Sequence, residues 1–118
     1  MQTPLQITFR HFPSSPALEA DLRARVDDLE KVFDRITGCR VLIEAPHHHQ
    51  QHGQLYRVRI AIDVPGEHLV AGRSPDEHAA HEDPYVAARD AFRAAHRQLE
   101  DYVRRRRDDA RFSPWSAA

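Results

Sequence analysis

The sequence predicts a two-layer fold of the α/β (α+β) class, with the element order β-α-β-β-β-α and two parallel helices packed on one face of a four-stranded mixed sheet. Two segments repeat apolar residues every three or four positions, as amphipathic helices do. Four shorter segments alternate apolar and polar residues, as strands with one buried face do. The length of 118 residues suits a single domain with one core.

Residues 5–12 alternate apolar and polar side chains and are predicted to form the first strand. The helix predicted for residues 16–36 follows a pair of serines, with Pro16 at the first helical position, where its missing N–H has no cost. We expect this helix to end before Gly38. Its apolar residues recur at helical spacing: Leu18, Leu22, Val26, Leu29, Phe33 and Ile36.

Three further segments alternate and are predicted to be strands: residues 39–45, 55–64 and 67–73, the last two joined by a Pro-Gly turn at residues 65–66. The connection through the first helix is long enough for a right-handed crossover, so the first two strands should be parallel and the others antiparallel. We expect the sheet face opposite the helices to be open to water. This face should display Thr8, Arg10, Arg40, Arg57 and Arg59.

The second helix is predicted for residues 83–107, with Asp83 as the N-cap and Pro84 at the first helical position. One apolar stripe indicates its packed side: Tyr85, Ala88, Phe92, Ala95, Leu99 and Tyr102. A cationic row follows about a quarter turn away: Arg89, Arg93, His96, Arg97 and Arg104.

Positive charge is unevenly distributed, because the net charge of the whole chain is −1 but residues 84–107 hold seven arginines against three carboxylates. Residues 16–36 are acidic in balance, and their charges alternate at the spacing of a salt-bridged, solvated helix face. The four consecutive arginines 104–107 wrap the helix circumference, and the helix dipole favours only one or two of them. We interpret the rest as phosphate ligands that form a ladder with Arg89, Arg93 and Arg97; a solvated charge run is the alternative.

Histidines cluster in two predicted loops, one holding His47, His48, His49 and His52 and the other His78 and His81. Imidazoles at such spacings can bind zinc, yet the spacing matches no known zinc motif and no cysteine joins them. We predict no metal site. A polar solvated loop is favoured, and phosphate contact by protonated imidazoles is an alternative. The less favoured metal candidates are His47, His49, His52, His78 and His81.

Several classes of function are excluded by what the sequence lacks. It has no nucleophile elbow, phosphate-binding loop or dinucleotide fingerprint, so we predict no enzyme, no cofactor and no small-molecule substrate. Apolar runs are too short to cross a bilayer and no secretory signal is visible, so a cytoplasmic protein without membrane contact is expected. The single cysteine, Cys39, excludes an intrachain disulfide and is expected in the core.

An ordered set of short motifs carries a family resemblance. They are L-E-K at residues 29–31, V-P-G at 64–66, L-V-A-G at 69–72, H-E-D-P-Y-V-A at 81–87 and R-Q-L at 97–99. With the element order, they make residues 5–107 resemble the ribosome hibernation-promoting factor family, also called ribosome-associated inhibitor A or sigma-54 modulation proteins. The resemblance implies a protein that binds the small ribosomal subunit in the channel of mRNA and tRNA and silences translation under stress.

In that family, basic residues of both helices face ribosomal RNA. Five basic residues here occupy basic family positions: Arg25, Lys31, Arg97, Arg104 and Arg105. Three positions that usually hold lysines in the family are occupied here by Asp28, Ala94 and Asp101 or its neighbour, so this chain is less basic than typical members. Together with the phosphate ladder, the predicted RNA-binding set is Arg25, Lys31, Arg89, Arg93, Arg97, Arg104, Arg105, Arg106 and Arg107.

We therefore predict a ribosome-binding domain over residues 1–111 and a flexible tail or linker stub over residues 112–118. The long family form has a C-terminal dimerisation domain that nothing after Arg111 supplies, so pairing of ribosomes would need a second hibernation factor or a longer parent chain. Two rival functions remain open. One is a protein-interaction module that uses the helix pair or a sheet edge, and the other is a metal-binding domain built on the histidine loops.

Overall fold

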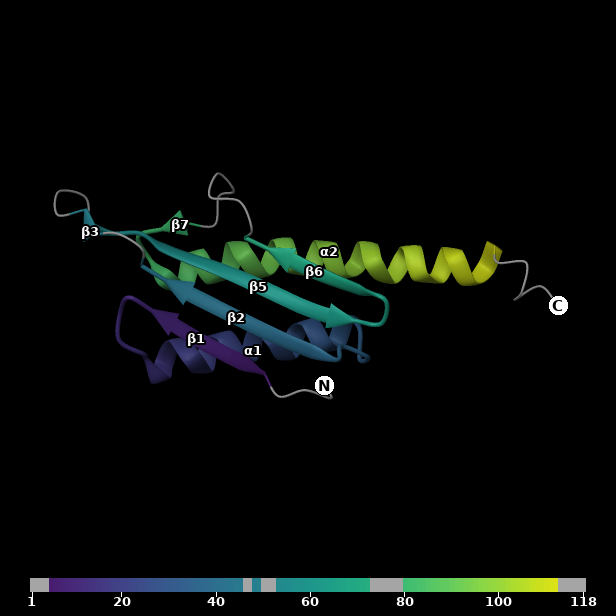
Figure 1. Cartoon of the computed structure of the whole chain (residues 1–118), viewed down its shortest axis with the longest axis horizontal. Coiled ribbons are helices and arrows are strands. Elements are labelled where there is room, and N and C mark those ends of the chain that lie inside the picture. Colours follow the sequence, from purple (N-terminus) through teal and green to yellow (C-terminus); the bar gives the residue numbers. More distant parts are fainter. Residues whose placement is uncertain (1–4, 46–47, 50–52, 73–79, 113–118) are drawn as a thin grey trace.

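The computed structural model of the protein describes residues 5–45, 48–49, 53–72 and 80–112. A sheet forms one layer, and two helices run side by side and in the same direction along one of its faces (Figure 1). The predicted fold class is confirmed. The elements are β1 (Gln6–Arg10), α1 (Pro16–Val32), β2 (Gly38–Glu44), β3 (His48–His49), β4 (Gly53–Gln54), β5 (Tyr56–Val64), β6 (Glu67–Ala71), β7 (Ala80–His81) and α2 (Pro84–Phe112).

The main sheet has the strand order β1-β2-β5-β6. β1 pairs with β2 in parallel, and β5 pairs antiparallel with both β2 and β6, as the predicted crossover and hairpins require. The short strand β7 pairs with the first two residues of β5, so β6 and β7 lie along the same edge of β5. β3 and β4 form a separate two-stranded ribbon.

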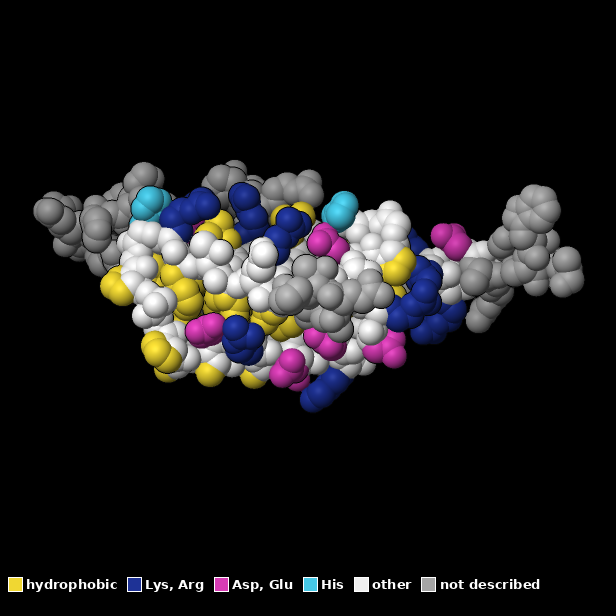
Figure 2. Space-filling view, turned by 60° about the horizontal axis from the view of Figure 1, so that its bottom comes forward, with side chains coloured by type: hydrophobic (Ala, Val, Ile, Leu, Met, Phe, Trp, Pro, Cys, Tyr) yellow, Lys and Arg dark blue, Asp and Glu magenta, His cyan; other side chains and the backbone are white. Residues whose placement is uncertain are grey.

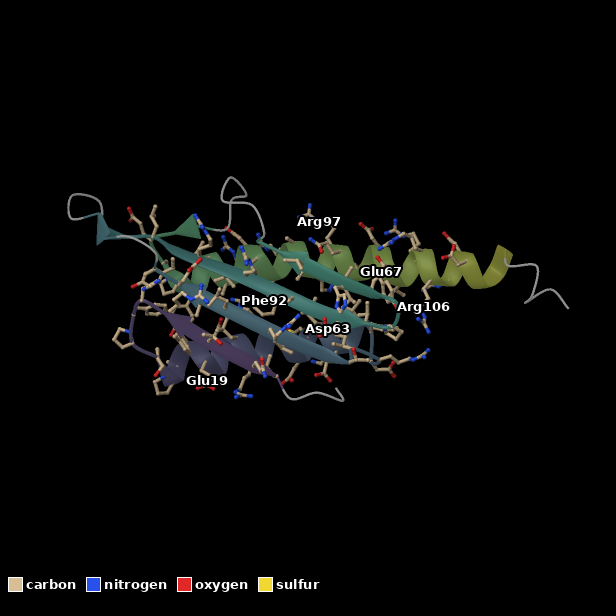
Figure 3. The ribbon with its side chains drawn as sticks, viewed as in Figure 1. Glu19, Asp63, Glu67, Phe92, Arg97 and Arg106 are labelled. Carbon is tan, nitrogen blue, oxygen red and sulfur yellow. The ribbon has the colours of Figure 1, made fainter. Side chains whose placement is uncertain are left out.

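The core lies between the inner face of the sheet and the facing stripes of both helices, with Phe92 of α2 pointing toward the strands (Figure 3). Cys39 of β2 is buried there as a free thiol, as expected. Burial raises the pKa of this thiol to about 12, and the carboxylates of Asp63 and Glu30 act in the same direction. The largest fully buried side chains are Leu18, Leu22, Leu29, Ile43, Ile60, Ile62 and Leu99.

Helix α1 begins as predicted, because Ser15 Oγ accepts a hydrogen bond from the Leu18 N–H at 3.2 Å. The predicted end at Ile36 is wrong, since α1 ends at Val32 and Phe33 is extended with φ of −151°. Phe33 leaves the helix to pack edge-on against Tyr102 of α2, with ring centroids 5.4 Å apart. Ile36 still reaches the core, but from the connecting segment.

Two strands are shorter than predicted because the backbone turns at identifiable residues. β1 ends at Arg10, since His11 has a φ of 66°, and Phe12 then packs on Phe9 rather than extending the strand. β6 ends at Ala71, followed by Gly72 with a φ of 80°. A Cβ at Gly72 would lie 2.2 Å from the Val58 carbonyl oxygen, so only glycine fits this approach to β5.

Helix α2 carries the cap that the sequence predicts, since the Tyr85 N–H donates to Asp83 Oδ1 at 2.8 Å. It continues beyond the predicted end at Arg107 to Phe112. Tyr85 was expected in the packed stripe, but it is 40% exposed, and burial starts at Ala87 in the next turn. Residues 113–118 lie outside the described part, so the division at residue 112 stays a prediction.

Candidate nucleic-acid interface

Three arginines of the predicted cationic row lie on the outward side of α2, about half a turn from its buried stripe rather than the quarter turn expected from the sequence. Arg93, Arg97 and Arg104 follow at intervals of four and seven residues, which place them on one line along the helix. All three are exposed, and Arg97 projects away from the strands (Figure 3). The predicted cationic row therefore exists as a surface feature.

Some of these cations have no partner among the residues that the structure describes. Arg93, Arg97 and Arg107 make no hydrogen bond or ion pair with any residue that the structure describes. A guanidinium without a carboxylate keeps all of its N–H donors and its full charge available for an external anion. These three side chains are therefore the most available phosphate ligands on α2.

Other helix cations are paired with a carboxylate close in sequence. Arg89 contacts Asp90 Oδ1 at 3.3 Å, and Arg104 contacts Asp101 Oδ1 at 3.3 Å. On α1, Arg25 donates to Asp21 Oδ2 at 2.8 Å and Lys31 lies 3.6 Å from Asp28. These pairs are at or near the surface, so each contributes little to stability, but each reduces the positive charge offered to a ligand.

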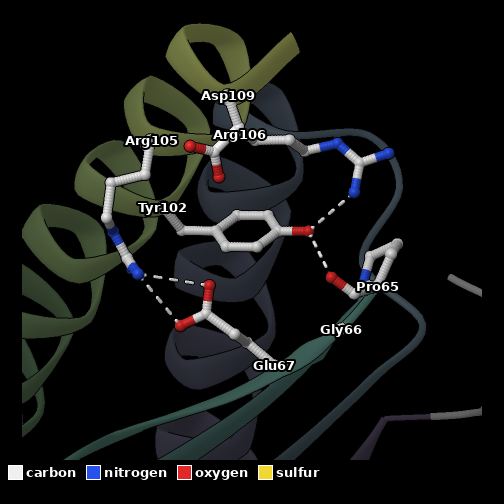
Figure 4. A pocket seen from close by; sticks show the side chains of 7 residues that line it. All are labelled: Pro65, Gly66, Glu67, Tyr102, Arg105, Arg106 and Asp109. Carbon is white, nitrogen blue, oxygen red and sulfur yellow. Dashed lines mark hydrogen bonds and ion pairs between the residues drawn. The ribbon is translucent and has the colours of Figure 1, made fainter. Parts of the chain in front are cut away.

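Two arginines within the run, Arg105 and Arg106, are held by contacts inside the domain. Arg105 donates to both carboxylate oxygens of Glu67 at 3.2 and 3.3 Å (Figure 4). Arg106 donates to the Tyr102 hydroxyl at 3.0 Å and lies over the Phe33 ring, 6.0 Å from its centroid. Tyr102 in turn donates to the Pro65 carbonyl oxygen at 2.6 Å. The interpretation of this run mainly as phosphate ligands missed these intramolecular partners.

A shallow pocket of about 280 Å³ lies beneath this end of α2. Arg105 and Arg106 on its wall are balanced by Glu67 and Asp109, so its charges do not favour an anion. Its remaining lining comes from the 65–66 turn and Tyr102 (Figure 4). The pocket lies where α2 packs against the β5–β6 hairpin.

The open face of the sheet is a second basic surface. Dark blue side chains gather over the strands, apart from a group toward the end of α2 (Figure 2). Arg10 lies 3.8 Å from Glu44, and Arg40 lies 3.6 Å from Asp63. Asp63 is held more closely by His68 Nδ1 at 2.6 Å. As predicted, the arginines of β1, β2 and β5 lie on this face.

The side chains of the histidine candidates lie outside the described part of the chain. His47, His52 and His78 are not among the described residues, and His49 and His81 are described only as backbone of β3 and β7. Among the described side chains, no group of three histidines, cysteines or carboxylates is placed to hold a metal ion. In the same part of the chain, no helix combines the length and hydropathy needed to cross a membrane.

Comparison with known proteins identifies the family to which this chain belongs. A family model described as sigma 54 modulation protein / S30EA ribosomal protein matches residues 5–107. The chain belongs to this family. Its members are ribosome-associated proteins, and the resemblance noted from the motifs is confirmed. A search of curated proteins gives no match.

Two solved structures share the fold of this family member. A ribosomal subunit interface protein from Coxiella burnetii has a TM-score of 0.67 and 18% identity, covering 84% of this chain and 96% of its own. The N-terminal domain of Thermus thermophilus Protein Y has a TM-score of 0.65 and 16% identity, covering 82% of this chain and 94% of its own. At this level of identity they establish the fold only.

Proposed function

We propose that this protein binds the ribosomal RNA of the small subunit, in the channel used by mRNA and tRNA, and silences translation by occupying it under stress. The observation that carries the proposal is a set of exposed arginines on α2, Arg93, Arg97 and Arg107, that have no partner among the described residues, in a chain of this ribosome-associated family. The name of the Coxiella protein, a ribosomal subunit interface protein, is consistent with such a role. The protein would act in the cytoplasm.

Within this proposal, the basic residues have graded roles. Arg93, Arg97 and Arg107 contact phosphates directly, because no described carboxylate competes for them. The paired cations contribute less, because a phosphate oxygen must first replace their carboxylate partner or, for Arg106, the Tyr102 hydroxyl. This second group is Arg25, Lys31, Arg89, Arg104, Arg105 and Arg106.

Occupancy alone accounts for inhibition, and the proposal includes no catalytic step, cofactor or small-molecule substrate. Phosphate contacts position a protein on RNA without reading its sequence. Each phosphate that is neutralised releases counterions, so the affinity should fall steeply as salt is raised.

Sedimentation with purified small subunits tests the proposal. The protein should migrate with the subunits through sucrose at low salt and be released at raised salt. The variant with Arg93→Glu and Arg97→Glu should lose co-migration, whereas Arg23→Glu with Arg35→Glu, an equal change of charge outside the proposed set, should retain it. Absence of wild-type co-migration at low salt, or equal behaviour of the two variants, would contradict the proposal.

One observation favours a second candidate, a protein-interaction module. Within the described residues, β1 pairs only with β2 and so forms one edge of the main sheet. Ile7 and Phe9 of β1 are only partly buried. Such an edge can accept a strand from a partner protein. Binding to small subunits that persists unchanged at raised salt would favour this candidate.

A further inference from the structure

We propose that the open face of the sheet is a second binding surface for a phosphodiester backbone, formed by Arg10, Arg40, Arg57 and Arg59. The proposed function uses only the two helices and leaves this face unassigned. The nature of the RNA rests on the proposed function, whereas the charge and geometry of the face do not depend on it.

The strand register brings the four arginines into one patch. Arg10 lies opposite Glu44, and Glu44 lies opposite Arg57, so Arg10 and Arg57 share one row across three strands. Arg59 is two residues further along β5, and Arg40 pairs with Ala61 two residues beyond that. With about 4.8 Å between strands and 3.4 Å per residue, the patch is about 10 Å across and 14 Å long.

The charge of this patch is presented outward. Arg10 is 54% exposed while its neighbour Glu44 is 17% exposed, and Arg40 is 59% exposed while Asp63 is 29% exposed. The carboxylates are thus recessed, in the sense that they are less exposed to solvent than the guanidinium groups. Distances of 3.8 and 3.6 Å are also too long for hydrogen bonds, so the N–H donors stay free.

The two arginines of β5, of which Arg59 is exposed and Arg57 half-buried, are not held by carboxylates in the described part of the chain. Arg57 and Arg59 have no ion pair with any residue in the described ranges, and none of the four guanidinium groups donates a hydrogen bond there. By contrast, Arg25 on α1 is held by Asp21 at 2.8 Å. The patch carries four arginines against the two recessed carboxylates of Glu44 and Asp63, so its net charge is positive without any contribution from His68.

The centre of the patch suits the less polar parts of a nucleotide chain. Leu42 of β2 is half-buried between Thr8 and Arg59 in the same row. Sugar and base can pack on this apolar centre while the surrounding guanidinium groups reach phosphates or stack on bases. A peptide carboxylate would engage the arginines but would leave this repeated spacing unused, so a polyanionic RNA chain is the better match.

The proposed surface lies opposite the helix pair, on the other side of the domain (Figure 1). A domain that occupies a channel meets walls on both sides, so cationic side chains on both layers allow contact with two RNA segments at once. This chain has an aspartate or alanine at three helix positions, residues 28, 94 and 101, and the sheet arginines can offset the resulting loss of contacts.

The test compares Arg57→Gln with Arg59→Gln against a control of equal charge, Arg23→Gln with Arg35→Gln. Binding is measured by fluorescence anisotropy with a labelled single-stranded RNA oligonucleotide and by sedimentation with small subunits, each over a salt series. We expect the sheet variant to bind the oligonucleotide about tenfold more weakly, with a salt slope smaller by about 1.4, and the control to stay within about twofold of wild type. Unchanged binding by a folded sheet variant would overturn the proposal.

A second variant, which is expected to bind RNA more tightly, separates a loss of binding from a loss of folding. Glu44→Gln removes a carboxylate and leaves Arg10 unmatched, so it should tighten oligonucleotide binding about twofold or more, which a damaged fold would not do. If wild type fails to bind subunits, the proposed function fails, and the oligonucleotide alone then decides the sheet proposal. If subunit and oligonucleotide binding are both unaffected by the sheet variant, the helix assignment stands and the sheet proposal is rejected.

Discussion

The two faces of this domain carry arginines in different electrostatic settings. On the helices, carboxylates one turn away hold the cations, as in Arg25 with Asp21 and Arg104 with Asp101. On the sheet, arginines alternate with inward-facing core residues, and the nearest carboxylates are recessed on neighbouring strands. Spacing of three or four residues makes side chains neighbours on a helix, whereas strand neighbours are set by register.

The comparison shows that the density of arginine in a sequence is a poor measure of free positive charge. The run at residues 104–107 is the densest, yet Arg105 and Arg106 are held by Glu67, Tyr102 and Phe33. More widely spaced arginines on α2 and β5, and Arg107 at the end of the run, have no described partner and keep their charge available to a ligand. The side chains without a described partner are Arg93, Arg97 and Arg107 on α2 and Arg57 and Arg59 on β5.

Gly72→Ala should disturb the sheet face most. The new Cβ would lie 2.2 Å from the carbonyl oxygen of Val58, the residue between Arg57 and Arg59, in a backbone with φ of 80°. We expect a loss of about 2 to 4 kcal/mol in unfolding free energy, measured by urea denaturation. Gly66→Ala is the control, since its φ is 84° but no atom lies within 4 Å, and it should lose only about 1 kcal/mol. Equal losses would contradict the packing described for β5 and β6.

Tyr102→Phe should weaken the contact between the C-terminal part of α2 and the β5–β6 turn. It removes the donor to the Pro65 carbonyl oxygen and the acceptor for Arg106 while keeping the ring against Phe33. We expect a loss of about 1 to 2 kcal/mol in unfolding free energy. Small-subunit binding should be retained or slightly strengthened, because Arg106 is released. A large loss of binding with unchanged stability would mean that Tyr102 itself contacts the RNA.

Cys39 and Arg40 contrast the two sides of β2, one buried and one exposed. Because the pKa of the thiol is raised from 9.0 to about 12, the folded protein holds a proton that the unfolded chain releases between these values. Stability from this group is complete below pH 9 and falls above it, by about 1.4 kcal/mol per pH unit. Denaturation near pH 8 and near pH 10 measures this, with Cys39→Ala as the control. Equal pH dependence in both proteins would contradict it.

Glu67→Gln should have the smallest effect and tests whether pairing limits the arginine run. It removes the charge that binds Arg105 at 3.2 and 3.3 Å. Stability should change by less than about 0.5 kcal/mol, because the pair is exposed. Affinity for small subunits should rise about twofold, measured by sedimentation at several protein concentrations. A fall in affinity would show that the paired geometry, rather than free charge, is what binds.

Most of the fold could be predicted because its determinants are local. Caps at Ser15 and Asp83, strand alternation and the 65–66 turn all operate within a few residues. The end of α1 was missed because Phe33 and Ile36 continue the helical period while packing from outside the helix. Periodicity records which residues are buried, but it does not record which element carries them. β3, β4 and β7 are two residues long each and lie in and beside the histidine loops, where apolar and polar residues do not alternate.

The candidate site was only partly predictable. The row of Arg93, Arg97 and Arg104 follows directly from helical spacing. The partner of Arg105 is 38 residues away in sequence, and Arg106 depends on Phe33 from another element, so neither contact has a local signature. The arginines of the open sheet face were predicted from alternation, but their recessed carboxylates depend on register across three strands.

The most direct test of the account compares two charge-matched variants in one sedimentation experiment with small subunits at low salt. Arg93→Gln with Arg97→Gln removes two unpartnered arginines, and Arg104→Gln with Arg105→Gln removes two that already have carboxylate partners. We expect the first variant to lose most of its co-migration and the second to keep most of it. Equal loss in both, or greater loss in the second, would contradict the claim that free arginines hold this protein on the ribosome.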